Sequence, residues 1–230
     1  MSGTSVTNLG TGGSAYNAVL KNNPTISTTD KVVGTGAIEL SSSYSQYVQI
    51  PAFTAGSTGF SVAFWCKYLP GSVSPARIFD FGNGASSDNI IFSIYGSTLN
   101  KFSMGVYKGS TAAYSIQKSF GSPVDDGIWR HSVWTIDTAG NWNYFLNGVR
   151  NMSVSAVGTF NTISRTTNYL GKSNFPGDPY FNGAIDEFFL FQSVLTPMQV
   201  QTLYGEGILP LCCHFLFYPV FPLIYYSIHR

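Results

Sequence analysis

Residues 174–180, with the sequence Asn-Phe-Pro-Gly-Asp-Pro-Tyr, place aromatic rings beside polar side chains in one short segment. The prolines and the glycine predict a loop. Ligand sites commonly combine aromatic surface with a few polar groups that fix orientation, which suits a sugar ring and its hydroxyl groups. Asn174, Phe175, Asp178 and Tyr180 are therefore candidate ligand-binding residues. In the alternative interpretation, the two rings only anchor the loop to the domain.

A second loop, at residues 82–89, consists mainly of small and polar residues. Such a segment is flexible enough to close over a ligand, and it forms the second candidate rim for recognition. Asn83 therefore joins the candidate ligand-binding residues.

The carboxylates do not form the pattern that glycan hydrolysis needs. Those enzymes use paired carboxylates, typically as Glu-x-Asp-x-Glu along one strand, so that alternate side chains share a cleft. No such triplet occurs in the sequence. Asp186 and Glu187 are consecutive and would point to opposite faces of a strand. We predict structural or solvated roles for these two and for Asp125 and Asp126, which precede a glycine in a predicted turn.

Nucleophilic catalysis also lacks its components. A Ser-His-Asp arrangement needs a histidine with a committed partner. His131 shares a strand face with Trp129 and is expected to pack against the sheet. Cys66 lies in an apolar strand, where a buried thiol is inert. We therefore predict a non-catalytic protein with no catalytic residues, and a degenerate glycan hydrolase is the remaining alternative of this class.

The composition predicts one large folded domain. The 230 residues are 44% hydrophobic, which is enough for a sizeable core and excludes disorder. The 12 Lys and Arg residues balance 11 Asp and Glu residues without clustering. This excludes nucleic acid as a partner, because phosphate binding needs clustered cations. The first residues show neither a basic start nor an apolar run, so we expect no cleaved export signal.

Apolar and polar residues alternate over most of the chain, which predicts an all-β protein. The predicted strands are 37–40, 47–50, 60–68, 77–81, 89–95, 102–107, 129–137, 142–146, 149–154, 168–170 and 184–191. So many short strands separated by turn residues are typical of a sandwich or barrel. Residues 1–36 are rich in Ser, Thr, Gly and Asn and are predicted to be loosely structured, with a loose lead-in at residues 1–7, before pairing with a sheet.

Two local signals are sharper than the rest. Asn147-Gly148 predicts a two-residue hairpin turn, because both residues tolerate a positive φ. Thr196 and Gln199 form a capping box around Pro197. They predict one short helix over residues 197–204, which the following glycine would end.

Several motifs occur together in a recognisable order. They are Trp129-Arg130-His131-Ser132-Val133, Ala139-Gly140, Trp142 to Leu146, Asn147-Gly148, Tyr169-Leu170-Gly171, Phe181 to Glu187, and Leu195-Thr196-Pro197 through Leu203-Tyr204. Over about residues 8–207, this order and spacing resemble the laminin-G-like and pentraxin-like families. The resemblance implies a concanavalin A-like jelly roll, which is a sandwich of two antiparallel sheets whose rim loops bind sugars, lipids or proteins, often through calcium.

The resemblance implies a calcium site that this chain completes poorly. Asp88-Asn89, ahead of an apolar strand, matches a calcium-binding pair of pentraxins. The acidic cluster that follows the Leu-Gly pair in pentraxins is replaced here by a segment that begins with Lys172, whose ammonium would repel the ion, while Asp178 partly compensates. Ca²⁺ is thus the one cofactor considered, with Asp88 and Asn89 as its ligands. In the alternative interpretation, these two residues form a turn ahead of their strand.

The resemblance has two further structural implications. The cysteine positions of the pentraxin disulfide correspond to Ala63 and Val133, which should therefore be neighbours on adjacent or facing strands. Asp186 should bond backbone or loop groups.

Residues 208–230 differ abruptly in composition from the rest of the chain. Residues 208–228 contain no Asp, Glu, Lys or Arg, and their length suits a membrane-spanning helix, but their prolines oppose one. We predict an appendage outside the jelly roll of residues 1–207. Three interpretations stay open: a membrane-contacting tail with lipidated Cys212 and Cys213, a segment buried against the domain or a partner, and a sequence without a selected role.

These observations favour a binding module that recognises a glycan or a protein surface through its rim loops, as in lectins and cell-adhesion domains. The alternative is a structural component of a virion or other particle coat, whose tail docks into a membrane or a neighbouring subunit. Under either hypothesis, we expect the protein at a particle surface or at a membrane contacted by residues 208–228. Oligomerisation is left open.

Overall fold

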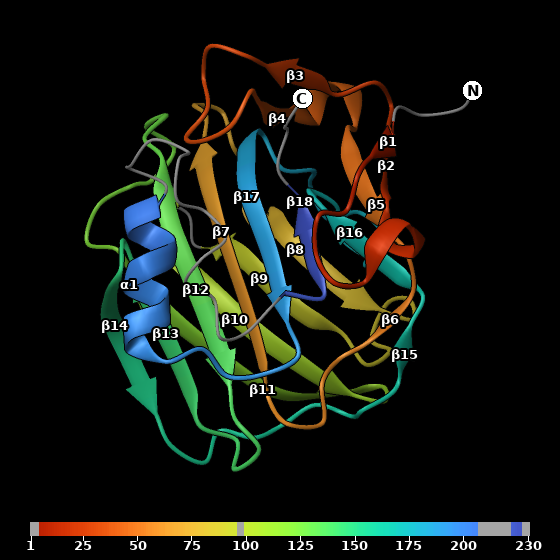
Figure 1. Ribbon diagram of the computed structural model, residues 1–230, viewed down its shortest axis with the longest axis vertical. Coiled ribbons are helices and arrows are strands. Elements are labelled where there is room, and N and C mark those ends of the chain that lie inside the picture. The colour runs from red at the N-terminus through yellow and green to blue at the C-terminus, as the bar shows by residue number, and fades with distance from the viewer. Residues whose placement is uncertain (1–4, 96–98, 207–221, 227–230) are drawn as a thin grey trace.

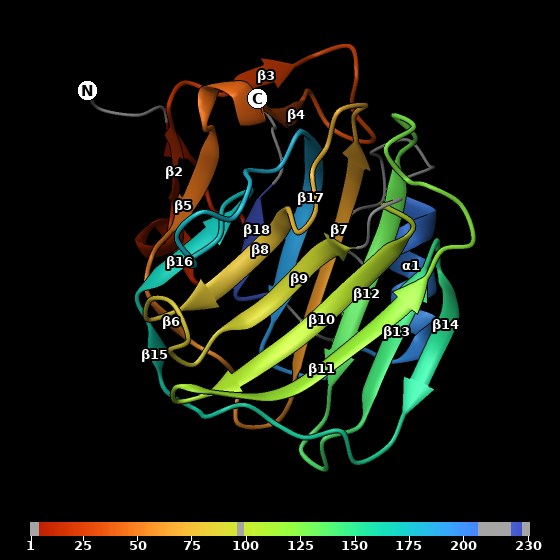
Figure 2. The same ribbon diagram turned by 180° about the vertical axis from the view of Figure 1, so that it is seen from behind.

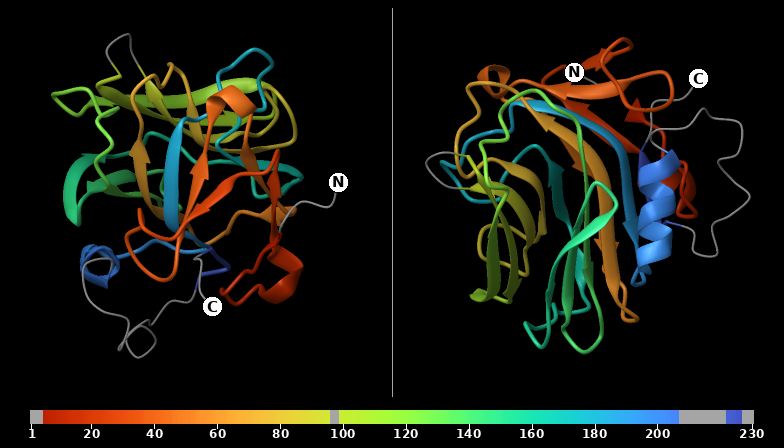
Figure 3. Two further views of the ribbon diagram at one scale, coloured as in Figure 1. Left: turned by 90° about the horizontal axis from the view of Figure 1, so that it is seen from above. Right: turned by 90° about the vertical axis from the view of Figure 1, so that its left-hand side faces the viewer.

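The computed structural model describes residues 5–95, 99–206 and 222–226. Two large antiparallel sheets pack face to face, as predicted from the alternation (Figure 1). We call them sheet I and sheet II. Figure 2 shows the molecule from the side of sheet I, and the right-hand view of Figure 3 shows the two layers on edge.

Sheet I is a run of eight strands. In spatial order they are β1 (Ser5–Val6), β2 (Ala18–Lys21), β5 (Tyr47–Ile50), β16 (Thr167–Leu170), β8 (Arg77–Gly82), β9 (Ile90–Tyr95), β10 (Lys101–Lys108) and β11 (Thr111–Ser119).

Sheet II lies behind it. In spatial order its strands are β14 (Val149–Val154), β13 (Trp142–Leu146), β12 (Arg130–Ile136), β7 (Phe60–Tyr68), β17 (Gly183–Phe191), β4 (Ala37–Leu40) and β3 (Thr25–Ser27), and β18 (Ile224–Tyr226) also pairs with β17. The remaining elements are the strand pair β6 (Phe53–Thr54) and β15 (Ser164–Arg165), the helix α1 (Pro197–Glu206), and the 3₁₀ turns η1 (Gly13–Tyr16) and η2 (Ser42–Tyr44).

The main core lies between the sheets. Phe60, Val62 and Phe64 of β7 are fully buried in it, as the two-residue period predicts. Rings from sheet I meet them, and Phe64 lies 5.3 Å from Phe92 in an edge-to-face arrangement. Burying a side chain of this kind contributes about 1.5–3 kcal/mol, so these strands are fixed by packing.

A second apolar cluster lies on the outer face of sheet II, under α1. It contains Ala63, Val133, Phe145, Phe189, Phe191, Leu195, Val200, Leu203 and Tyr225. The right-hand view of Figure 3 shows α1 on the side of this sheet that faces away from sheet I. Ala63 and Val133 are direct partners in the β7–β12 pairing, which confirms that they are neighbours.

Both local signals of the sequence are confirmed. Asn147 and Gly148 have φ values of 49° and 78° and connect β13 to β14. At the start of α1, the Thr196 N–H donates to Gln199 Oε1 (2.8 Å) and the Gln199 N–H donates to Thr196 Oγ1 (3.3 Å), which completes the capping box. The predicted end was wrong by a short distance: Gly205 lies inside the last turn, because a glycine lowers helix stability by only about 1 kcal/mol.

Two parts of the sheets were not predicted. β11 was missed because it is an edge strand with mostly exposed side chains, so its apolar alternation is weak. The expectation of a loose segment over residues 1–36 was wrong in part, since this segment contributes β1, β2 and β3. These three strands are only two to four residues long, which is too short for the apolar–polar alternation to be recognised.

The segment 222–226 is part of the sandwich. Figure 1 shows β18 beside β17. On one side, the Leu223 N–H donates to the Leu190 carbonyl (2.9 Å), and on the other, the Leu9 N–H donates to the Tyr225 carbonyl (2.9 Å). This short segment is therefore held between β17 and the chain near the N-terminus.

The prediction that residues 208–230 lie outside the jelly roll was therefore wrong for this segment. Ile224 and Tyr226 belong to the main core, and Tyr225 belongs to the cluster under α1. The apolar character of the segment reflects burial on both faces of a strand.

Residues 207–221 and 227–230 lie outside the described residues, and with them lie Cys212 and Cys213 and the predicted membrane contact. Among the described elements, no helix is long and apolar enough to cross a membrane.

Candidate functional site

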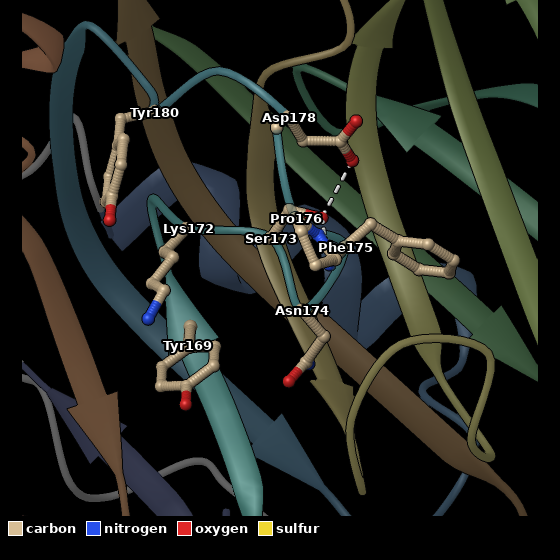
Figure 4. Close-up of a pocket in the computed structure, with 9 residues that line it drawn as sticks. Tyr169, Lys172, Ser173, Asn174, Phe175, Pro176, Asp178 and Tyr180 are labelled. Carbon is tan, nitrogen blue, oxygen red and sulfur yellow. Dashed lines mark hydrogen bonds between the residues drawn. The ribbon is translucent and has the colours of Figure 1, made fainter.

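A pocket of about 280 Å³ lies beside the loop of residues 171–182, which connects β16 to β17. Its lining consists of Tyr169, Lys172, Ser173, Asn174, Phe175, Pro176, Gly177, Asp178 and Tyr180 (Figure 4). The structure thus places four of the predicted residues, Asn174, Phe175, Asp178 and Tyr180, in one pocket.

Strand alternation places this pocket on the outer face of sheet I. In β8, Phe79 and Phe81 enter the main core, so Asp80 between them points to the outer face. In β16, Leu170 enters the core, and Tyr169 points outward for the same reason. The β16–β17 loop lies over these two outward residues.

Asp80 anchors the loop. Its Oδ1 accepts hydrogen bonds from Asn174 Nδ2 (2.9 Å) and Asn89 Nδ2 (2.8 Å), and its Oδ2 accepts one from the Asn174 N–H (2.9 Å). Asp80 is completely buried, and this burial raises the pKa of its carboxyl group, while the hydrogen bonds from Asn174 and Asn89 oppose the shift. Asp80 was not predicted from the sequence, although a carboxylate between two phenylalanines of a strand was a usable signal.

Asp178 is held by an ion pair. Arg77 Nη2 lies 2.9 Å from Asp178 Oδ2, and the Ser173 hydroxyl donates to the same oxygen (2.8 Å). The Arg77 guanidinium also lies 5.8 Å from the centre of the Phe175 ring. Arg77 therefore holds the side chains of Asp178 and Phe175 in position on the wall of the pocket. Such preorganisation favours binding.

Tyr169, Tyr180 and Lys172 form the other wall, and Tyr47 packs against all three. The Tyr47 ring, from β5, lies 5.4 Å from the ring of Tyr169 and 6.2 Å from that of Tyr180. Lys172 Nζ lies 4.6 Å from the centre of the Tyr47 ring and 4.5 Å from that of the Tyr169 ring. All four side chains are partly exposed. Their combination of ring faces and donor groups is suited to a sugar.

The hydroxyls of Tyr169 and Tyr47 stay protonated at neutral pH. Burial, followed by the Asp80 carboxylate and Tyr180, raises the pKa of Tyr169. Burial and the two neighbouring tyrosines raise the pKa of Tyr47. Both hydroxyls can therefore donate hydrogen bonds. Neither residue was singled out from the sequence, because only the pairing of β5 with β16 brings the two strands together.

Asn83 does not join this group. Its Oδ1 accepts hydrogen bonds from the Thr166 N–H and hydroxyl (both 2.9 Å), and its Nδ2 donates to the Ser164 carbonyl (2.9 Å). Asn83 therefore ties the 82–89 loop to the chain around β15, and it is not among the residues that line the pocket.

One side-chain oxygen of each predicted calcium ligand, Asp88 and Asn89, already accepts hydrogen bonds. Asp88 Oδ1 accepts hydrogen bonds from the Gly109 N–H (2.8 Å) and Asn161 Nδ2 (2.7 Å), and Asn89 Oδ1 accepts one from the Ser87 N–H (2.8 Å). Oxygens that already face N–H donors are poorly placed to coordinate a cation. Throughout the part of the chain that the structure describes, no three His, Cys, Asp or Glu side chains form a metal-binding group.

Asp186 and Glu187 have structural partners. Asp186 Oδ2 accepts hydrogen bonds from the N–H groups of Val32 (2.8 Å) and Val33 (3.1 Å), which confirms its predicted backbone role. The Tyr225 hydroxyl donates to Glu187 Oε2 (2.7 Å). Neither carboxylate lines the pocket.

His131 and Cys66 are both buried, as predicted. The His131 ring lies 5.2 Å from that of Trp65 and 5.9 Å from that of Tyr204, and burial lowers its pKa to about 3. Burial raises the pKa of the Cys66 thiol to about 12. A neutral imidazole and a protonated thiol at these depths are structural groups.

Comparison with known proteins agrees with the fold. A family model described as the concanavalin A-like lectin/glucanases superfamily matches residues 42–201. No curated protein matches the sequence.

Solved structures of similar fold include binding domains of larger proteins. Domain 4 of AbnA, a GH43 extracellular arabinanase from Geobacillus stearothermophilus solved with arabinotriose, is 21% identical, with a TM-score of 0.64 over 89% of this chain and 100% of that one. The receptor-binding domain of botulinum neurotoxin mosaic serotype C/D is 16% identical (TM-score 0.62; 90% of this chain, 51% of that one). A structure of botulinum neurotoxin type C, whose cell entry depends on interaction with two ganglioside molecules, is 17% identical (TM-score 0.55; 88% of this chain, 50% of that one). The chain thus spans about half of each toxin chain.

Proposed function

Because the chain belongs to the concanavalin A-like lectin/glucanases superfamily, we propose that it is a non-catalytic glycan-binding module whose site is the pocket beside the β16–β17 loop. The observation that carries this proposal is the placement of Tyr169, Tyr180, Asn174 and Asp178 around one hollow on the outer face of sheet I. Aromatic rings would stack on the sugar, and the amide, carboxylate and hydroxyl groups would bond its hydroxyls.

The rigidity of the site supports this role. Asn174 is fixed by Asp80, and Asp178 is fixed by Arg77. A site whose side chains are already held in place loses little conformational freedom when a ligand binds. The neighbours also agree in kind, since one was solved with arabinotriose and another is described with gangliosides.

The carboxylates at the site support binding without hydrolysis. A glycoside hydrolase needs one carboxyl group that donates a proton and a second that attacks or activates water. Here Asp178 is committed to Arg77, and Asp80 is buried beneath its hydrogen-bond donors. Neither is placed to exchange a proton with a sugar bound in the pocket.

A single substitution tests the proposal. Tyr180→Ala removes one ring from the pocket, and we expect affinity for bound oligosaccharides to fall about tenfold, because a stacked ring contributes about 0.5–1.5 kcal/mol beyond its buried area. A glycan array followed by calorimetry measures the change. Tyr44→Ala is the matched control, since Tyr44 is 71% exposed and does not line the pocket. A folded wild-type protein that binds no glycan on the array contradicts the proposal.

The coat-component hypothesis gains no specific support from the described residues. Removing residues 208–230 would not separate the two hypotheses, because this deletion also removes β18 from sheet II. The location of the protein at a particle surface or a membrane remains a proposal. It depends on residues outside the described part of the chain.

A further inference from the structure

We infer that the pocket selects glycans that carry a carboxylate, and that Lys172 recognises this group. The inference rests on the proposed glycan-binding function and adds a ligand class to it. It follows from the charges at the site and from the way in which Lys172 is held.

The charges that line the pocket are unequally paired. Asp178 is in contact with Arg77, so these two charges compensate each other. Lys172 lies in the same lining, yet among the described residues it forms no ion pair with a carboxylate. Asp80, the other carboxylate of the region, lies beneath the loop and is occupied by Asn89 and Asn174. The pocket wall therefore presents one cation that has no carboxylate in direct contact among the described residues.

The Lys172 ammonium is preorganised. It lies over the rings of Tyr47 and Tyr169 at 4.6 Å and 4.5 Å, and each cation–π contact restrains a side chain that would otherwise sample many rotamers. Figure 4 shows the side chain between those of Tyr169 and Tyr180. The two rings cannot accept hydrogen bonds from all three protons of the Lys172 ammonium. N–H donors therefore remain for a ligand.

This geometry matches the chemistry of an acidic sugar. A sugar ring stacked on the tyrosines would bring an attached carboxylate within reach of the ammonium. The resulting charge-assisted hydrogen bond is about twice as strong as a neutral one. A neutral sugar would leave Lys172 unpaired and would gain only the stacking and hydroxyl contacts. Discrimination of about tenfold is expected from one such contact.

Calorimetry with matched sugars tests the inference on the full chain. The probes are lactose, 3′-sialyllactose and 3′-sulfolactose, together with galactobiose and digalacturonate. In wild type, we expect each carboxylated sugar to bind about tenfold more tightly than its neutral partner, and the difference to shrink as NaCl rises from about 50 to about 300 mM. Equal binding of the sulfated and carboxylated sugars would overturn the assignment of a carboxylate.

Variants connect the preference to the residue. Lys172→Gln is expected to lose the preference for the carboxylated sugars, and Lys172→Arg is expected to retain it. Arg150→Gln is the matched control, because it removes an equal charge from exposed β14 in sheet II. The salt dependence is measured on the wild-type protein, so this test does not depend on whether a variant folds.

The outcomes separate the two proposals. Tight binding of neutral and acidic sugars alike by wild type would overturn the role of Lys172 and leave the glycan-binding function intact. A preference that survives in Lys172→Gln would do the same. Absence of binding to every sugar would overturn both.

Discussion

The outer faces of the two sheets are built from the same strand alternation but serve different purposes. On sheet II, Ala63 and Val133 are covered by α1 and form a second apolar cluster. On sheet I, the outward side chains include Tyr169, which is partly exposed and lines the pocket, and Tyr47, which is partly exposed and contacts Tyr169. One outer face therefore adds stability to the domain, and the other remains available for a ligand.

The difference follows from the residue types at the outward positions. Every residue of β7 and β17 is buried, so these strands need a cover on each side. In sheet I, several of the residues that alternate with the core positions are polar or amphipathic, such as Asp80 and Tyr169. A face of this kind can contact water without a covering helix.

The largest expected effect is the loss of stability when β18 is removed. This truncation tests how far the covered face of sheet II depends on the C-terminal segment. Truncation after residue 221 removes Ile224 and Tyr226 from the main core and Tyr225 from the outer cluster. We expect a cost above about 5 kcal/mol, since one large buried side chain alone is worth about 2–5 kcal/mol. Urea denaturation measures it.

The matched control for this truncation is removal of residues 227–230 only. If both truncated proteins unfold at the same urea concentration as the full chain, the integration of β18 into sheet II is refuted.

The next effect concerns the anchor of the open face. Asp80→Ala leaves the donors of Asn89 and Asn174 without their shared acceptor, which should lower stability by about 3 kcal/mol and weaken glycan binding further by releasing the loop. Thermal unfolding and calorimetry measure the two effects. Unchanged sugar affinity in a folded Asp80→Ala protein would show that the loop does not need its anchor.

A smaller effect is the loss of stability in acid that follows from His131, which is buried on the covered face of sheet II. Burial lowers the pKa of His131 to about 3, so below its ordinary value near 6.5 the unfolded chain binds a proton that the native protein does not. Stability is therefore lost as pH falls from about 6.5 toward 3, by about 1.4 kcal/mol per pH unit, or about 2 kcal/mol at pH 5. Urea titrations between pH 7 and pH 5 measure the loss.

His131→Phe should remove this part of the acid sensitivity and keep the ring packing against Trp65 and Tyr204. Asp80 and Asp186 have raised pKa values and act in the opposite sense, so the comparison between wild type and variant cancels them. Parallel pH profiles for the two proteins would contradict the assignment.

The smallest expected effect is that of calcium. Because the oxygens of Asp88 and Asn89 face N–H donors, we expect about 1 mM Ca²⁺ and an equal concentration of chelator to give unfolding temperatures that agree within about 1 °C. A clear stabilisation by Ca²⁺ that is lost in Asp88→Asn would restore the metal site.

Much of the fold was readable from the sequence because it depends on local patterns. The alternation in β7 predicted its buried face, and Asn147-Gly148 and Thr196 to Gln199 fixed a turn and a helix start. β18 was not predicted because the pattern of a strand buried on both faces resembles that of any apolar segment.

The site was only partly readable for a related reason. The four predicted site residues of the loop, Asn174, Phe175, Asp178 and Tyr180, are close in sequence. The composition of this segment alone indicated a binding loop. Tyr47 and Lys172 are far apart in sequence and meet only because β5 pairs with β16. Asn83 lies outside the lining of this pocket, because two loops of similar composition can lie at different places on the rim.

The most direct test of the account is the position of a bound sugar. Backbone amide NMR shifts of the full chain, recorded during titration with the tightest-binding oligosaccharide from the array, would report it. The account predicts the largest shifts at Tyr169, Lys172 and residues 174–180, on the outer face of sheet I. Saturable shifts confined to α1 and the outer face of sheet II, with this pocket unchanged, would contradict it.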